Sequence, residues 1–305
     1  MTARVVFMGT PEAALPTLET LTAHHDVALV VTQPDRPRGR SGRPAPSPVK
    51  TAAEGLGIQV AQPKTRADLH EAVSAAGPFD VGVVVAYGRI LREEVLELPA
   101  HGLLNVHFSL LPRWRGAAPV ARALLAGDRM TGITIIRLDE GLDTGPVLTA
   151  QGIDVHPDEN AGQLTERLAT IGARLLAETL PSYLSGDLIP VAQSDEGLTY
   201  AAKIEPGERR IDPSSTIERI VDQVRALAPA PAATLDLDGT IHKVYEVRPA
   251  ASGPEAGRWG SVDGRPVFGA NDGWIELVSL QTPGRERQAG ADWLRGRRSD
   301  GGVVG

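Results

Sequence analysis

Three polar side chains in two short segments have the types and spacing that an acyl-type transfer needs. Asn105 and His107 lie two positions apart in the mostly apolar run 103–107, so an extended strand would place the amide and the imidazole on one face. Asp143 lies in the turn 139–145, just after the β-branched run 132–136, and glycines in that turn allow a sharp bend that aims a carboxylate inward. The amide can stabilise an oxyanion, the imidazole can donate a proton, and the carboxylate can set the imidazole charge and receive a proton. If the substrate supplies an amine, no serine or cysteine nucleophile is needed.

Each of these residues also has an ordinary structural interpretation. A single histidine at a strand end is often a hydrogen-bonded structural group, and an aspartate among glycines is often only a turn former. Their combination favours a site, because all three follow predicted strands and ligands collect at the carboxyl ends of strands in open parallel sheets. We therefore expect the three groups to converge.

The elements that would position these groups alternate between strand and helix. Short apolar segments predict strands at 5–8, 27–32, 58–61, 80–86 and 103–107. Helical spacing predicts helices at 12–23, 66–76 and 117–126, and a long amphipathic helix from 160 to about 186. Almost continuously apolar strands separated by helices indicate an α/β domain with a parallel sheet covered on both faces. The loop 9–12 lacks the full dinucleotide glycine fingerprint and a P-loop lysine motif, which disfavours a nicotinamide or ATP role.

The last third of the chain has a different sequence pattern. Residues 188–205 show little periodicity and are interpreted as a linker, and a helix is predicted at 211–228. Asp238-Gly239 and Asp263-Gly264 each separate apolar alternating segments, which is a hairpin signal and predicts a small β-barrel. Residues 207–305 carry 13 Lys and Arg against 14 Asp and Glu, so any nucleic-acid contact there would depend on a few placed residues.

The segments around the three polar residues resemble the folate-dependent formyltransferases. The resemblance is carried by the runs Asn105–Pro119 and Asp139–Gly145, and it covers most of the chain. Further matching runs lie at Val5–Glu12, Thr32–Pro37, Pro46–Lys50 and Val83–Gly88. A long ungapped match with the three residues at fixed spacing is far more specific than a lone glycine motif.

This resemblance implies a fold and an activity. The fold is a Rossmann-like parallel-sheet formyltransferase domain at 1–187, the linker at 188–205 and an OB-like β-barrel domain at 206–305. The activity is formyl transfer from 10-formyltetrahydrofolate to the α-amino group of methionine on initiator tRNA, with no metal. The catalytic residues would be Asn105, His107 and Asp143, and the folate-binding segment would comprise Ser109, Leu110, Leu111 and Pro112. At Phe108 the resemblance implies a glycine in several relatives, and strand alternation predicts that the ring points away from the face of Asn105 and His107.

An arginine-rich segment follows the second predicted strand. It carries Arg36, Arg38, Arg40 and Arg43, then Lys50, with no acidic residue after Arg36 and many Pro, Gly and Ser residues. A solvated loop is one interpretation; the other is that its guanidinium groups bind phosphates or bases. The family resemblance favours the second, because it implies a loop that meets the tRNA acceptor end, with Arg40 as the first candidate.

Composition agrees with an ordinary enzyme. The chain has 305 residues, 42% hydrophobic residues and a net charge of −7, so two domains are expected and a global basic surface is excluded. The absence of cysteine excludes disulfides and thiol catalysis and agrees with a reducing cytosol. No segment predicts a signal peptide or a membrane span, so we expect a cytoplasmic protein with no membrane partner. We also expect a monomer.

Two alternatives stay open. The first is another formyltransferase that acts on glycinamide ribonucleotide, on an amino sugar nucleotide or, with water as acceptor, on formylfolate itself. The second is a tRNA-binding protein that keeps the fold without turnover. The additional β-domain and the arginine-rich segment favour tRNA over the other acceptors, and the intact set of Asn105, His107 and Asp143 favours turnover.

Overall fold

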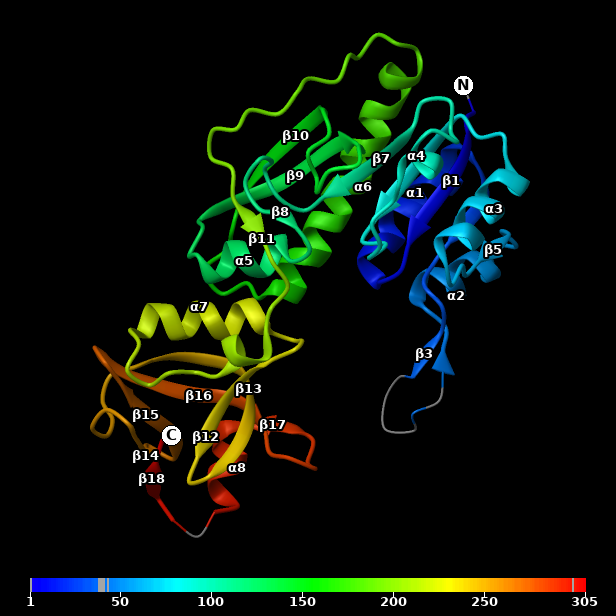
Figure 1. The fold of residues 1–305 in the computed structure, drawn as a ribbon. Helices are drawn as coiled ribbons and strands as arrows, with labels where there is room; N and C mark the ends of the chain where they lie inside the picture. The colour runs from blue at the N-terminus through cyan, green and yellow to red at the C-terminus, as the bar shows by residue number, and fades with distance from the viewer. Residues whose placement is uncertain (1, 38–41, 43, 298) are drawn as a thin grey trace. The chain divides into compact units, whose positions relative to one another are not determined.

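The computed structural model describes residues 2–37, 42, 44–297 and 299–305, and Figure 1 traces the chain through them. The chain forms two compact units. Unit 1 runs through Pro119 and adds Met130–Asp154 and Thr165–Ala201. Unit 2 comprises Val120–Arg129, Val155–Leu164 and Ala202–Gly305.

A seven-stranded sheet forms the centre of unit 1, with the strand order β10-β9-β7-β6-β1-β2-β5. Its strands are β1 (Arg4–Gly9), β2 (Asp26–Val31), β5 (Val60–Ala61), β6 (Val81–Val85), β7 (Leu103–His107), β9 (Met130–Arg137) and β10 (Val147–Asp154). Strands β5, β2, β1, β6 and β7 are parallel, so the predicted α/β class with a mainly parallel sheet is confirmed. A purely parallel sheet was wrong at one edge, where β9 is antiparallel to β7 and β10 to β9. The two edge strands form a hairpin, which reverses the chain direction.

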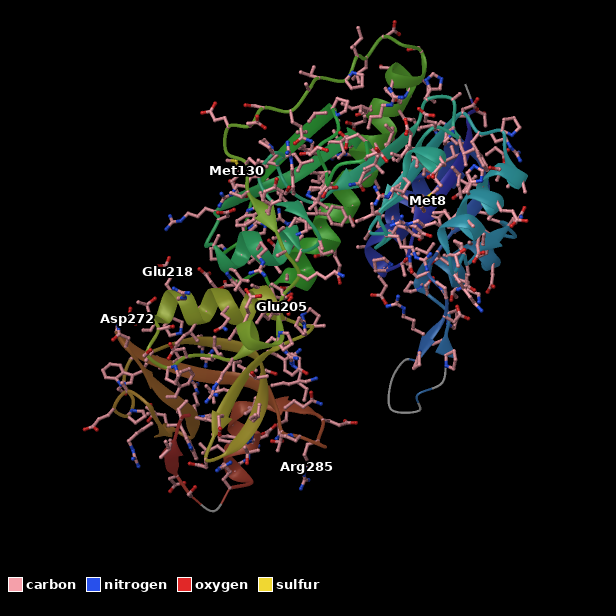
Figure 2. The ribbon with its side chains drawn as sticks, in the orientation of Figure 1. Met8, Met130, Glu205, Glu218, Asp272 and Arg285 are labelled. Carbon is pink, nitrogen blue, oxygen red and sulfur yellow. The ribbon has the colours of Figure 1, made fainter. Side chains whose placement is uncertain are left out.

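Helices accompany the parallel strands of unit 1. They are α1 (Leu15–His24), preceded by the 3-10 turn η1 (Glu12–Ala14), then α2 (Pro48–Gly55), α3 (Arg66–Ala76), α4 (Glu93–Leu96) and the greater part of α6 (Ala161–Leu184). The bounds of α3 agree with the prediction because Thr65 and Asp68 form a reciprocal capping box at its first turn. Leu69 of α3 belongs to the same buried cluster as Met8 of β1, which Figure 2 labels within the first strand.

Helix α6 lies against the strand that carries the predicted catalytic residues. A Cβ atom at Gly172 would lie 2.7 Å from Cγ1 of Val106 and 3.4 Å from Cγ2 of Ile133. Val106 is 3% exposed and sits between Asn105 and His107, so its side chain points to the α6 face while theirs point to the other. The missing side chain at Gly172 therefore allows the helix to approach β7 closely.

Two short pairings complete unit 1. β3 (Arg36–Pro37) is antiparallel to β4 (Pro44–Ala45), and β8 (Arg115–Gly116) is parallel to β11 (Tyr200–Ala201). The second pairing brings the end of the predicted linker onto the segment that follows the folate-binding residues.

Unit 2 contains the predicted small β-barrel. Its strands are β12 (Ala233–Leu237), β13 (Thr240–Ala250), β14 (Arg258–Val262), β15 (Arg265–Ala270), β16 (Gly273–Gln281), β17 (Arg287–Ala289) and β18 (Gly301–Val303), in the order β12-β13-β16-β15-β14-β18 with β17 on β16. A bridge between Leu237 and Val304 joins the two ends of this order and closes the sheet. Both predicted Asp-Gly hairpins are confirmed, with positive φ at Asp238 and Asp263 and at the glycine after each.

The helices of unit 2 include α5 (Pro119–Leu125), α7 (Ile217–Leu227) and α8 (Gly290–Arg295), with a 3-10 turn, η2 (Pro206–Arg209). The helix predicted at 211–228 begins later, because Asp212 accepts hydrogen bonds from both the N–H and the hydroxyl of Ser214 in a local turn. Thr216 then caps α7 by accepting the N–H of Arg219. Figure 2 labels Glu218 at the start of this helix.

In the part of the chain that the structure describes, no helix combines the length and the apolar character that crossing a bilayer requires.

The close approach at Gly172 can be tested by adding one methyl group. We expect Gly172→Ala to lower the free energy of unfolding by about 1 to 3 kcal/mol, because the stiff, buried side chain of Val106 occupies the space that the methyl group needs. This loss outweighs the higher helix propensity of alanine, which favours the variant by ~1 kcal/mol. Urea denaturation followed by circular dichroism would measure the change.

The control is the compensating substitution on the strand. Val106→Ala alone leaves a cavity, whereas Val106→Ala combined with Gly172→Ala should be more stable than the sum of the two single effects predicts. A Gly172→Ala variant as stable as the original chain would contradict the close approach.

Candidate active site

The structure brings the three predicted catalytic residues together. Asn105 Nδ2 lies 3.5 Å from Asp143 Oδ1, and His107 Nδ1 lies 3.7 Å from Asp143 Oδ2. One carboxylate therefore faces the amide with one oxygen and the imidazole with the other. The first distance is at the outer limit of a hydrogen bond and the second exceeds it, a looseness common in sites without bound substrate. The side chains of His107 and Asp143 are only 6% and 14% exposed, which strengthens electrostatic interaction between them.

Asp143 reaches this position by a route that strand order alone did not suggest. The expectation that all three groups follow parallel strands was wrong for Asp143, because β9 runs antiparallel to β7 and its last residue, Arg137, pairs with Leu104. The connection after β9 must therefore return along β7 before the carboxylate can face Asn105 and His107.

The returning loop is held by its own hydrogen bonds and by close backbone packing. Asp139 Oδ1 accepts the N–H of Gly141 at 3.1 Å and the hydroxyl of Thr144 at 2.7 Å. A Cβ atom at Gly145 would lie 1.8 Å from the carbonyl oxygen of Arg137, so only glycine fits there. Asp143 itself has a φ of 53°, in the left-handed region that costs a non-glycine residue energy. The loop thus fixes the direction of the carboxylate through a strained backbone.

A backbone donor completes the environment of the carboxylate. The N–H of Gly116 donates to Asp143 Oδ2 at 2.8 Å. Gly116 has a φ of 124°, and a Cβ there would lie 2.9 Å from the carbonyl oxygen of Ala201. Gly116 lies in the run Asn105–Pro119 that carries the family resemblance, but its bonding role depends on the β8–β11 pairing, which no local pattern predicts.

The second ring nitrogen of His107 also faces an oxygen. Nε2 lies 3.0 Å from the carbonyl oxygen of Trp114, which has a φ of 65°. A carbonyl can only accept, so Nε2 carries a hydrogen in this contact. Both ring nitrogens face acceptors, an arrangement in which a doubly protonated imidazole can donate on both sides.

The predicted folate-binding segment begins directly after this strand. The hydroxyl of Ser109 donates to the carbonyl of Arg113 at 2.6 Å, and Ser109 is completely buried. Leu110, Leu111 and Pro112 are partly exposed. The contact surface that this segment offers to a ligand therefore comes from the last three residues, while Ser109 shapes the turn.

A threonine that sequence reasoning missed clips this segment to the sheet. The hydroxyl of Thr134 donates to the carbonyl of Ser109 at 2.7 Å and accepts the N–H of Leu111 at 3.0 Å, and its side chain is fully buried. Thr134 pairs with His107 across β7 and β9, so one position supports both the strand end and the segment. Its membership of a β-branched run predicted only a strand.

Gln193 is a further residue that the sequence did not single out. Its side-chain amide donates to the carbonyls of Asp143 and Gly145, although it lies in the segment interpreted as a linker. No sequence signal marked Gln193, because a segment without periodicity contains no pattern that identifies its distant partners.

The other predicted residues are placed only in part. Phe108 is buried, with 8% exposure. Of the predicted tRNA-binding residues, Arg36 is exposed on β3, whereas Arg38, Arg40 and Arg43 lie outside the described residues. Lys50, at the end of that segment, is bonded to Asp35 at 2.8 Å and to Gln62 at 2.9 Å. Hydrogen bonds from Lys50 and Gln62 lower the pKa of Asp35. The charge of this lysine is therefore already paired with a carboxylate.

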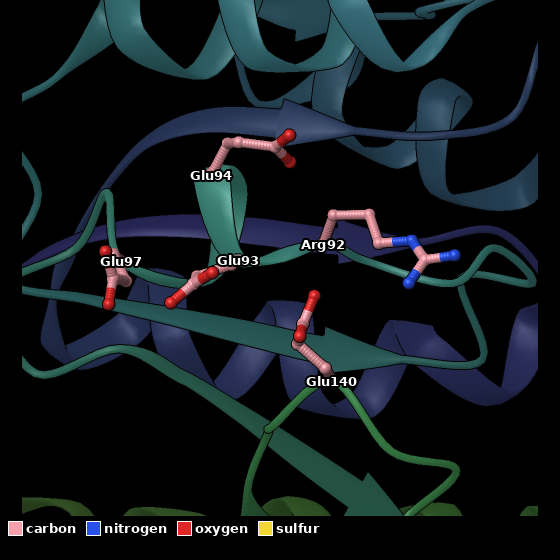
Figure 3. A pocket seen from close by; sticks show the side chains of 5 residues that line it. All are labelled: Arg92, Glu93, Glu94, Glu97 and Glu140. Atoms are coloured by element: carbon pink, nitrogen blue, oxygen red, sulfur yellow. The ribbon is translucent and has the colours of Figure 1, made fainter.

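A separate pocket of about 290 Å³ contains none of the predicted site residues. Figure 3 shows its lining, which comprises Arg92, Glu93, Glu94, Glu97 and Glu140. Four carboxylates against one guanidinium disfavour an anionic ligand in this pocket.

Known proteins are similar to this chain over nearly its whole length. Residues 3–180 match the family described as Formyl transferase, and residues 203–298 match Formyl transferase, C-terminal domain. A protein of Halorhodospira halophila named methionyl-tRNA formyltransferase is 48% identical over 303 residues, which cover 98% of this chain and 97% of that protein. A protein of Roseobacter denitrificans with the same name is 42% identical, with 99% of this chain and 98% of that protein covered.

A solved structure has the same fold over most of the chain. The crystal structure of HypX from Aquifex aeolicus in complex with tetrahydrofolic acid matches with a TM-score of 0.70 at 17% sequence identity. The match covers 96% of this chain and 47% of the other, so this chain spans about half the length of that protein. At this identity the likeness concerns the fold alone.

The clip at Thr134 can be tested by replacing its hydroxyl with a methyl group. We expect Thr134→Val to lower the free energy of unfolding by about 1 to 3 kcal/mol, because a buried carbonyl and a buried N–H lose their partner. Urea denaturation would measure this change.

The matched control lies on the same strand. The hydroxyl of Thr131 is buried with no hydrogen-bond partner among the described residues, so Thr131→Val should leave stability unchanged or raise it. Equal losses in the two variants would show that the hydroxyl of Thr134 has no special role.

Proposed function

The chain belongs to the formyl transferase family, and on this premise we infer that it formylates the α-amino group of methionyl-tRNA. The predicted family is confirmed, because both family regions match and relatives of nearly equal length carry this activity in their names. We propose 10-formyltetrahydrofolate as the formyl donor and initiator methionyl-tRNA as the acceptor. The observation that carries the proposal is the convergence of an amide, an imidazole and a carboxylate in a chain with this full-length similarity.

The proposed reaction is a direct transfer between two amines. The neutral amine of the methionyl group attacks the formyl carbon, and the bond from that carbon to the folate nitrogen breaks. The proton that the amine loses ends on the folate nitrogen. No covalent bond to the protein forms, and the reaction as proposed uses no metal.

The proposed roles of the residues follow from their chemistry. Charge develops on the formyl oxygen during attack, and the amide of Asn105 with the imidazole of His107 would donate to it. His107 would donate through Nδ1, whose distance of 3.7 Å from Asp143 is too long for a hydrogen bond. Asp143 faces both groups, so its carboxylate can orient the amide and the imidazole and accept the amine proton before it passes to the folate nitrogen. Leu110, Leu111 and Pro112, which are partly exposed beside His107 in the chain, would contact the folate.

We propose the same domain organisation as the sequence predicts. Residues 1–187 are the catalytic domain, 188–205 the linker and 206–305 the OB-like domain. The similarity of residues 203–298 to the family's C-terminal domain supports the last boundary. The second compact unit differs from this division, because it groups residues 120–129 and 155–164 with the barrel.

The proposed partners also follow the sequence. Arg36, Arg38, Arg40 and Arg43 would contact the tRNA acceptor end, since guanidinium groups bind phosphates well. We propose that the protein acts in the cytoplasm as a monomer and without a membrane partner.

The acceptor can be identified by direct competition between substrates. Purified protein with 10-formyltetrahydrofolate should block the amine of methionyl-tRNA, with initiator tRNA preferred over elongator tRNA. Glycinamide ribonucleotide, an amino sugar nucleotide and water should be much poorer acceptors in the same assay. Turnover of one of these instead of methionyl-tRNA would assign the chain to another branch of the family, and tight tRNA binding without turnover would indicate a binding protein.

The role of the amide can be tested by truncation. Asn105→Ala should lower kcat by roughly 10²-fold or more, because one donor to the developing oxyanion is lost, with the KM for the folate little changed. Steady-state formylation with varied folate would separate the two constants. Asn271→Ala, at an exposed position in unit 2, is the matched control and should keep full activity. Full turnover by Asn105→Ala would rule out its assigned role.

A further inference from the structure

We propose that Gln193 is a positioning residue for the carboxylate of Asp143, so that part of the predicted linker belongs to the catalytic machinery. This inference rests on the proposed function of Asp143. It concerns only residues of unit 1, whose last segment is Thr165–Ala201.

Both N–H groups and the oxygen of the Gln193 amide have hydrogen-bond partners. Nε2 donates to the carbonyl of Asp143 at 2.8 Å and to the carbonyl of Gly145 at 2.7 Å. Oε1 accepts from Arg115, at 3.0 Å from Nε and 2.7 Å from Nη2. Because two donors meet two carbonyls and the oxygen meets a guanidinium, the orientation of the amide is determined by its partners. Gln193 therefore bridges the main chain of the Asp143 loop to Arg115.

The loop needs such support because its conformation is strained. Asp143 has a φ of 53°, and a non-glycine residue in the left-handed region persists only where its surroundings fix it. The carbonyl of Asp143 belongs to the residue whose side chain faces Asn105 and His107. Fixing that carbonyl and the one two residues later restricts the rotation of the backbone that carries the carboxylate.

The same network reaches the carboxylate from its other side. Arg115 is buried, with 6% exposure, and its neighbour Gly116 donates its N–H to Asp143 Oδ2 at 2.8 Å. Gln193 thus holds the main chain of Asp143, while the residue next to its partner Arg115 holds the carboxylate. A shift of Gln193 would therefore act on the carbonyl of Asp143 directly and on its carboxylate through Arg115 and Gly116.

The segment that carries Gln193 is itself anchored on both sides. Before it, Val191 exchanges two backbone hydrogen bonds with Val147, at 2.7 and 2.8 Å. After it, Thr199 accepts the N–H of Trp114 with its hydroxyl at 2.9 Å and the N–H of Arg115 with its carbonyl at 3.0 Å. A chain fixed at these points can hold a side chain in place, which a flexible tether cannot do.

Gln193 is expected to affect turnover rather than binding. It contacts no reacting atom in the proposed mechanism, and its partners are the Asp143 loop and Arg115. A misplacement of about 1 Å in a catalytic group can cost up to roughly 10²-fold in rate. Gln193→Ala should therefore lower kcat by about 10- to 100-fold, with the KM values for tRNA and folate changed less than about threefold.

Two further variants keep this test interpretable. Gln193→Glu retains the size and the contact with Arg115 but places a carboxylate against two carbonyls, so kcat should fall at least as far as in Gln193→Ala. Ser194→Ala is the control in the same segment and should keep full activity. Ser194 is exposed, and among the described residues its hydroxyl accepts only the N–H of Glu196. Melting temperatures of all variants would show whether the fold is retained.

A double-mutant cycle separates positioning from a merely structural effect. In an Asp143→Asn background, adding Gln193→Ala should lower the single-turnover rate of formylation less than about twofold, because the group that Gln193 positions has already lost its function. If instead the two losses multiply, Gln193 acts on something other than Asp143 and the inference is overturned.

The outcomes distinguish this inference from the proposed function. Unchanged kcat in Gln193→Ala, with an active original chain, would overturn the role of Gln193 alone. An original chain that formylates no methionyl-tRNA would overturn the proposed function itself.

Discussion

The antiparallel direction of β9 is the constraint on which the site depends. Because Arg137 at the end of β9 pairs with Leu104, the following connection must return along β7 before a carboxylate can face Asn105 and His107. That return requires a left-handed residue at Asp143 and a glycine at position 145, where backbone passes against backbone. Strain of this kind costs of order 1 kcal/mol or more and is tolerated only where many contacts fix it. The contacts from Gly116 and Gln193 satisfy that requirement from two sides.

The resulting geometry suits catalysis by position and charge. One buried carboxylate faces an amide and an imidazole, and the other nitrogen of that imidazole faces a carbonyl. Because the imidazole and the carboxylate are largely buried, their electrostatic interaction is stronger than it would be in solution. Because the proposed substrates bring both the nucleophile and the leaving group, the protein has to supply only orientation, donors and a route for one proton.

The charge distribution limits how a nucleic acid could be recognised. The chain carries a net charge of −7, and residues 207–305 are almost balanced, so a diffuse attraction to phosphate is weak. Lys50, at the end of the arginine-rich segment, is already paired with Asp35. Recognition of tRNA would therefore depend on a few arginines at fixed places, such as the exposed Arg36, and on the shape of the surface that receives the acceptor end.

Local patterns in the sequence determined most of the secondary structure and the relative placement of two of the three catalytic candidates, Asn105 and His107. Strand β7 and helix α3 have the predicted bounds, and the Asp-Gly hairpins occur where expected, because apolar periodicity, caps and turn residues act within a few positions. The spacing of Asn105 and His107 likewise needed only an extended strand. The tertiary structure alone decided the direction of β9, the return of the Asp143 loop, the clip at Thr134 and the bridge by Gln193. These features join residues up to 78 positions apart. Most of them use hydrogen bonds to main-chain carbonyl and N–H groups, which nearly every residue type offers alike and which therefore leave no mark in the sequence.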